Sequence, residues 1–190
     1  MDQVALSDVQ LNYLGKQDPV LGPVFQGVFP SNELPNNPPI PRPAAYIVNT
    51  DPAGEPGRHW LALWTQGTRA EVFDSYALPL RLYGVPLVEQ WLDDHWKTVT
   101  TNRRAVQALN SQACGHYAFF FLKVRARGHS MAEFLEDFSP SDYVGNDRFI
   151  GQALRRVIVR QLEGWEHACR HPSLQCCRSK QVNCTLYKEE

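Results

Sequence analysis

The sequence predicts an α+β domain. We expect a small mixed or antiparallel sheet packed with helices, and a candidate nucleophilic cysteine at the N-terminus of a central helix. Two observations carry this prediction. Strand-like runs gather between residues 44 and 73, whereas helical periodicity prevails from residue 86 onward. This order differs from the strand–helix alternation that builds a doubly wound parallel sheet.

The first half of the chain contains one helix signal, a loop and three strand signals. Ser7 and Gln10 have the spacing of a capping box, so a short helix begins there, and Gly15 is expected to end it. Seven prolines make residues 22–43 loop-like and exclude a central strand or a long helix. Short apolar runs separated by turns that contain glycine or proline indicate strands over residues 44–49, 59–64 and 70–73.

The second half is expected to be helical. Its helix signals cover residues 86–96, 113–125, 130–137 and 142–168. In the second of these segments, Tyr117, Phe121 and Val124 fall on one face. The last segment carries a single apolar stripe that runs from Phe149 to Trp165.

Length and composition limit the class of protein. With 190 residues, 43% of them hydrophobic, the chain can form one domain over residues 1–190, and residues 172–190 are expected to be a loosely packed C-terminal tail. No run reaches the roughly 18 apolar residues of a membrane span, and the N-terminus lacks the pattern of a secretory signal. Five cysteines favour a reducing compartment. We therefore expect a monomer that is neither secreted nor membrane-bound.

Charge is unevenly distributed, although the formal net charge is only −1. Residues 1–94 carry 5 basic and 11 acidic side chains, whereas residues 95–190 carry 14 basic and 9 acidic ones. No acidic residue occurs between His95 and Ala132. This stretch predicts either a basic face for nucleic acid or a solvated surface that the acidic half balances.

Cys114 is the candidate nucleophile. It stands in the string NSQACGHY, at the expected N-terminus of an apolar helix. The helix dipole and the free N–H groups of the first turn both favour a thiolate, which is the form that attacks a carbonyl carbon. Gly115 has no side chain and is expected to leave room for a substrate backbone beside the sulfur. The alternative is a buried cysteine that only packs.

A nucleophilic cysteine needs a base, and the base needs an acceptor to orient it. His59 begins one expected strand and Asp74 ends the next. If the two strands form an antiparallel hairpin, both residues lie at the same end of it. The alternatives are a surface histidine and an aspartate that only forms a turn.

An amide donor is needed for the negative oxygen of a tetrahedral intermediate. Gln107 stands seven residues before Cys114, and Gln112 stands two residues before it. Either side chain could act together with the Cys114 backbone N–H, and spacing alone leaves the choice open.

Together these residues resemble the adenovirus-type cysteine endopeptidases (adenain), within the wider group that includes the SUMO-specific proteases. The likeness covers about residues 14–171 in four blocks. They are YIVNT with a later HW, the Phe73–Asp74 pair, VQALNS followed by ACG, and a long terminal helix with LRR, QLEGW and RHP.

The resemblance implies a role for each residue. Cys114 is the nucleophile, His59 the general base, and Asp74 the residue that orients the histidine. The seven-residue spacing of adenain selects Gln107 as the oxyanion donor. Substrate binding is assigned to Trp60 and Gly115, and no metal is implied in the site.

The resemblance also implies a task and partners. The task is cleavage of viral precursor polypeptides at glycine-containing sites during particle maturation, in the virion and the host nucleus. Duplex DNA is implied as an activator, although no cofactor is required by the sequence itself. The family's activating peptide bonds to a cysteine whose place is taken here by Trp96, so we expect a non-covalent peptide.

Two other functions are carried as alternatives. The first is removal of ubiquitin-like modifiers, which also end in Gly-Gly. The second is a non-enzymatic nucleic-acid-binding or scaffold module, against which the presence of all four polar residues argues. Near the C-terminus, Cys169, Cys176, Cys177 and Cys184 lack the spacing of common zinc sites, so free thiols or a disulfide are expected there.

Overall fold

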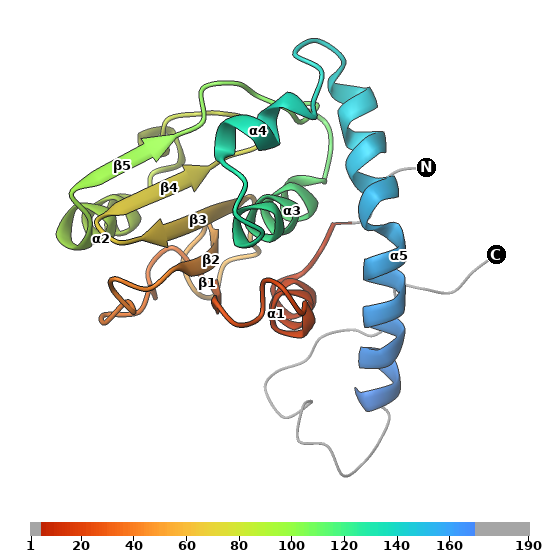
Figure 1. The fold of residues 1–190 in the computed structure, drawn as a ribbon, viewed down its shortest axis with the longest axis horizontal. Coiled ribbons are helices and arrows are strands. Elements are labelled where there is room, and N and C mark those ends of the chain that lie inside the picture. The colour runs from red at the N-terminus through yellow and green to blue at the C-terminus, as the bar shows by residue number, and fades with distance from the viewer. Residues whose placement is uncertain (1–4, 170–190) are drawn as a thin grey trace.

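A five-stranded mixed sheet forms the centre of the fold (Figure 1). The structure, a computed structural model, describes residues 5–169. Its strands are β1 Phe25–Phe29, β2 Ala44–Asn49, β3 Trp60–Gln66, β4 Arg69–Phe73 and β5 Thr98–Thr101. Its helices are α1 Asp8–Gln17, the 3-10 helix η1 Leu80–Tyr83, α2 Pro86–His95, α3 Cys114–Ala126, α4 Met131–Glu136 and α5 Tyr143–Cys169.

The strands lie in the order in which they occur along the chain. β2, β3 and β4 are antiparallel neighbours, whereas β1 and β5 pair in parallel with β2 and β4 at the two edges. The α+β class expected from the sequence is therefore confirmed, with a mixed sheet.

Each face of the sheet is covered by its own hydrophobic core. Successive residues of a strand point to opposite faces and therefore join different cores. In β2, Ala45 and Ile47 join the core that contains α1, α3 and α5, whereas Tyr46 and Val48 join the core that contains α2. Helix α3 packs on β3, and α5 covers α1 and α3 from outside (Figure 1). The candidate cysteine thus begins a helix that lies between the sheet and α5.

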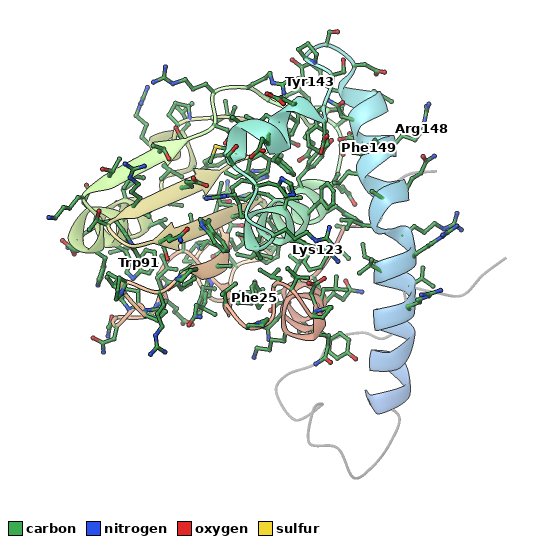
Figure 2. The ribbon with its side chains drawn as sticks, in the orientation of Figure 1. Phe25, Trp91, Lys123, Tyr143, Arg148 and Phe149 are labelled. Atoms are coloured by element: carbon green, nitrogen blue, oxygen red, sulfur yellow. The ribbon has the colours of Figure 1, made fainter. Side chains whose placement is uncertain are left out.

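Three expectations about the elements were wrong. Residues 25–29 form a strand inside the expected loop, which is possible because β1 is an edge strand and contains no proline. The short edge strand β5 was not expected. Gly15 does not end α1, which continues to Gln17. A β-carbon at Gly15 would lie 2.3 Å from the ring of Phe25, so this glycine allows α1 to pack closely on β1 (Figure 2).

Several expectations concern segments that the structure does not describe. The expected tail over residues 172–190 lies outside the described residues, as do Cys176, Cys177, Cys184 and the side chain of Cys169. Among the described helices, none is long and apolar enough to cross a membrane.

Candidate active site

Cys114 is the first residue of α3, as the sequence predicts, and its side chain is partly exposed. The preceding residue, Ala113, offers no side-chain cap to the helix. The first-turn N–H groups of α3 therefore keep their positive potential close to the sulfur. These N–H groups are also suited to bind a negative oxygen that forms beside the sulfur.

The β3–β4 hairpin brings His59 and Asp74 together. His59 directly precedes β3 and Asp74 directly follows β4, so the antiparallel register places both at the same end. The Nε2 atom of His59 lies 2.7 Å from Oδ1 of Asp74. Both residues are buried. Their proximity follows from the hairpin, as predicted from the sequence.

The imidazole of His59 also interacts with the side chain of Cys114, which acts on the pKa of His59. Because a carboxylate can only accept, Nε2 carries a hydrogen for Asp74, and Nδ1 is the ring atom left for the sulfur. Burial lowers the pKa of His59, but the bonds to Asp74 and Cys114 overcome this effect and raise it to about 9. The site therefore favours an imidazolium beside the sulfur near neutral pH.

Asp74 is held as a carboxylate by four donors. Oδ1 accepts from His59 and from the backbone N–H of Tyr76, at 3.0 Å. Oδ2 accepts from the backbone N–H of Leu78 and the hydroxyl of Tyr83, each at 2.8 Å. Burial raises the pKa of Asp74, but these bonds, led by that from His59, hold it below its usual value.

A side chain from the neighbouring strand fixes the backbone of Asp74. Asn102 follows β5, and its amide accepts from the N–H of Asp74 at 2.8 Å and donates to the carbonyl at 2.6 Å. Because β4 and β5 are parallel, their carboxyl ends share one edge of the sheet. Asn102 was not predicted as a site residue, because the strand that precedes it was not predicted either.

Two tyrosines enclose the imidazole and were also missed. The rings of Tyr76 and Tyr83 stack on His59, with centroid distances of 4.9 Å and 5.2 Å. The signal available in the sequence was the pair of aromatic residues within ten positions of Asp74. Stacked rings on both sides limit the orientations open to the imidazole.

Gln107 is buried within a hydrogen-bond network, whereas Gln112 is exposed. The Oε1 atom of Gln107 accepts from the hydroxyl of Ser75 at 2.6 Å. Its Nε2 atom donates to the carbonyl of Ser111 at 2.8 Å and to the hydroxyl of Tyr76 at 3.1 Å. Both amide hydrogens of Gln107 are therefore used within the chain.

Trp60 and Gly115 pack on each other and on the N-terminal segment. A β-carbon at Gly115 would lie 3.2 Å from the Trp60 ring and 3.3 Å from both Leu6 and Leu11. The indole Nε1 of Trp60 donates to the carbonyl of Leu6 at 3.2 Å. Close packing therefore gives a structural reason for the glycine, and the substrate-binding role of both residues stays a prediction.

The acid-free stretch is partly neutralised by the other half of the chain. Lys123 pairs with the buried Asp18 at 2.5 Å, and Arg125 pairs with Glu71 at 2.7 Å (Figure 2 shows Lys123 near α1). Arg104 donates to two backbone carbonyls at the end of α4. The exposed cations of the stretch are Lys97, Arg103 and Arg127. Half of its basic side chains thus have partners within the fold.

No protein-family model matches the sequence, and no curated protein matches it. Among solved structures, the chain is similar to the ASFV pS273R protease, with a TM-score of 0.46 and 17% identity over 77% of this chain and 66% of that one. The selenomethionine form of that protease gives a TM-score of 0.35 and 21% identity, over 79% and 56%. ChlaDub1 from Chlamydia trachomatis gives 0.43 and 15%, over 85% and 80%. The chain therefore spans less than two thirds of the ASFV protease.

Proposed function

We propose that this chain is a cysteine endopeptidase that uses Cys114, His59 and Asp74. The proposal rests on one observation. A buried imidazole is hydrogen-bonded to a carboxylate at 2.7 Å and interacts with the side chain of a cysteine at a helix N-terminus. This arrangement supplies a nucleophile, a proton carrier and an orienting acceptor within one hydrogen-bonded chain.

The chemistry follows from these contacts. The Cys114 thiolate attacks the carbonyl carbon, and the electron pair of the C=O bond moves to oxygen. When the C–N bond breaks, the imidazolium of His59 gives its proton to the leaving amine and becomes neutral. The neutral imidazole then takes a proton from water, which attacks the thioester carbon. When the C–S bond breaks, Cys114 leaves as the thiolate beside the imidazolium, and the starting pair is restored. Asp74 keeps the ring in the tautomer that these steps need.

The substrate class is proposed from the sequence resemblance. We infer glycine-containing sites in viral precursor polypeptides, with virion and host nucleus as the places of action. Duplex DNA and a non-covalent peptide are proposed as activators on the same basis. The exposed cations of the acid-free stretch support DNA contact, which should then weaken steeply as salt is raised.

The test is cleavage of a library of glycine-containing peptides by the purified full chain, with and without duplex DNA. We expect cleavage by the unaltered protein and by Cys184→Ala, which removes a thiol elsewhere in the chain. Cys114→Ala should cleave nothing while keeping the same thermal unfolding midpoint. Turnover that persists in Cys114→Ala would end the proposal, as would the absence of any cleaved peptide.

A further inference from the structure

Tyr76 contacts three of the four side chains assigned to catalysis. Its ring stacks on His59 with a centroid distance of 4.9 Å and an interplanar angle of 24°. Its backbone N–H donates to Asp74 at 3.0 Å, and its hydroxyl accepts from Nε2 of Gln107 at 3.1 Å. The charge of Cys114 also acts on this hydroxyl.

The hydroxyl of Tyr76 accepts one of the two hydrogen bonds that the amide of Gln107 donates. One amide hydrogen of Gln107 is fixed on the carbonyl of Ser111 at 2.8 Å. The other points at the oxygen of Tyr76. A substrate oxygen could accept directly from Gln107 only if it displaced one of these two acceptors.

The hydrogen bonds that the Tyr76 hydroxyl donates are weaker than those that the Gln107 amide donates. Its acceptors are the carbonyls of Leu109 and Ser111, both at 3.4 Å, beyond the usual range for an O–H donor. Turning this hydrogen toward a new acceptor therefore costs little. A hydroxyl that accepts one hydrogen bond also becomes a better donor in the next one.

We propose that the Tyr76 hydroxyl is the side-chain donor that meets the developing oxyanion, and that Gln107 acts through it. The order of hydrogen bonds is Gln107 amide to Tyr76 oxygen, then Tyr76 hydrogen to substrate oxygen. Each hydrogen stays on its own atom throughout. The Cys114 backbone N–H supplies the second donor. This inference rests on the proposed peptidase function and adds a catalytic residue to it.

The surroundings keep this hydroxyl protonated. Burial raises the pKa of Tyr76, and the charges of Cys114, Asp147 and Asp74 raise it further. A phenol that stays neutral at the pH of catalysis is able to donate to an anion. Its stacked ring and its backbone bond to Asp74 hold the donor in place before substrate arrives.

The test compares Tyr76→Phe with Gln107→Ala, the double variant and the control Tyr13→Phe, which loses a hydroxyl on α1. Phenylalanine keeps the ring that stacks on His59. We expect Tyr76→Phe to lower kcat by about 10²-fold with KM little changed. The double variant should be no slower than the slower single variant, because both changes break one chain of hydrogen bonds.

Two covalent inhibitors provide a readout that does not depend on the folded fraction. A peptide aldehyde adds to Cys114 and creates an oxyanion, whereas a peptide vinyl sulfone adds without one. Tyr76→Phe should weaken aldehyde binding in step with kcat and leave the vinyl sulfone rate nearly unchanged. A kcat of Tyr76→Phe equal to or above that of the parent would overturn the role of Tyr76, as would losses of kcat that multiply in the double variant. Cleavage by the parent would still support the peptidase proposal.

Discussion

Replacing Asp74 with asparagine tests the orienting carboxylate most sharply. The carboxylate accepts four hydrogen bonds, and an amide of the same shape offers only one oxygen. If the new NH₂ group faces His59, Nε2 must accept and Nδ1 then carries the hydrogen. That tautomer cannot take a proton from Cys114. If the NH₂ group faces Leu78 instead, a part-buried backbone N–H loses its acceptor, at a cost of about 1 kcal/mol.

The pKa of His59 gives the size of the effect. A rise from 6.5 to about 9 corresponds to roughly 3 kcal/mol in favour of the imidazolium. Asp74 is the leading contribution to this rise, and burial opposes it. In Asp74→Asn, the alkaline limb of kcat/KM should therefore move from about pH 9 to lower pH by about 1–3 pH units. Turnover at pH 7 should fall by about 10²–10⁴-fold.

The assay is cleavage of a fluorogenic glycine-containing peptide between pH 5 and 10. Asp93→Asn, at an exposed position of α2, is the matched control and should reproduce the parent profile.

The stability of the fold should also depend on the protonation of His59. Because the folded pKa of His59 lies above 6.5, its contribution is complete below that pH and is lost as the pH rises through about 9. An Asp74→Asn profile that overlays the parent's would refute the reasoning.

Three further changes test other parts of the site and its support. Gln107→Ala should lower kcat by about 10²–10³-fold, whereas Gln112→Ala, at an exposed position, should keep a kcat near that of the parent. The reverse result would show that Gln112, and not Gln107, belongs to the donor network. Gly115→Ala should destabilise the fold by about 1–3 kcal/mol in urea unfolding, because neighbouring side-chain atoms lie 3.2–3.3 Å from the added carbon. An unchanged urea midpoint would show that these side chains move aside at no cost. Lys123→Met should cost about 3–5 kcal/mol, since it leaves the buried Asp18 carboxylate unpaired. Because the folded pKa of Asp18 is lowered, the parent's stability from this pair should fade as pH drops below about 4, and a Lys123→Met protein with parental stability at pH 7 would contradict the assignment.

The sequence was sufficient for features that depend on local pattern. The capping box of Ser7, the strand β2 and the helix that begins at Cys114 all follow from short-range signals. The predicted hairpin also placed His59 and Asp74 at the same end, because an antiparallel register needs only two strands and a turn.

What the sequence could not supply depends on contacts between distant segments. The short strand β5 has no clear pattern of its own, and without it Asn102 cannot be placed beside Asp74. Likewise, spacing relates Gln107 to Cys114 along the chain but does not show that the amide of Gln107 donates to the hydroxyl of Tyr76. Gly15 suggested the end of a helix in the sequence. The structure gives another reason for this glycine, because the ring of Phe25 in β1 leaves no room for a β-carbon there.

In the proposed mechanism, the imidazole of His59 activates one cysteine sulfur among five. Mass spectrometry of the chain after brief exposure to a Gly-Gly peptide vinyl sulfone measures this directly, because the four other cysteines serve as internal controls. We expect a single adduct on Cys114 that forms quickly in the parent and very slowly in His59→Ala. Adducts spread over the five cysteines, or equal rates in the two proteins, would contradict it.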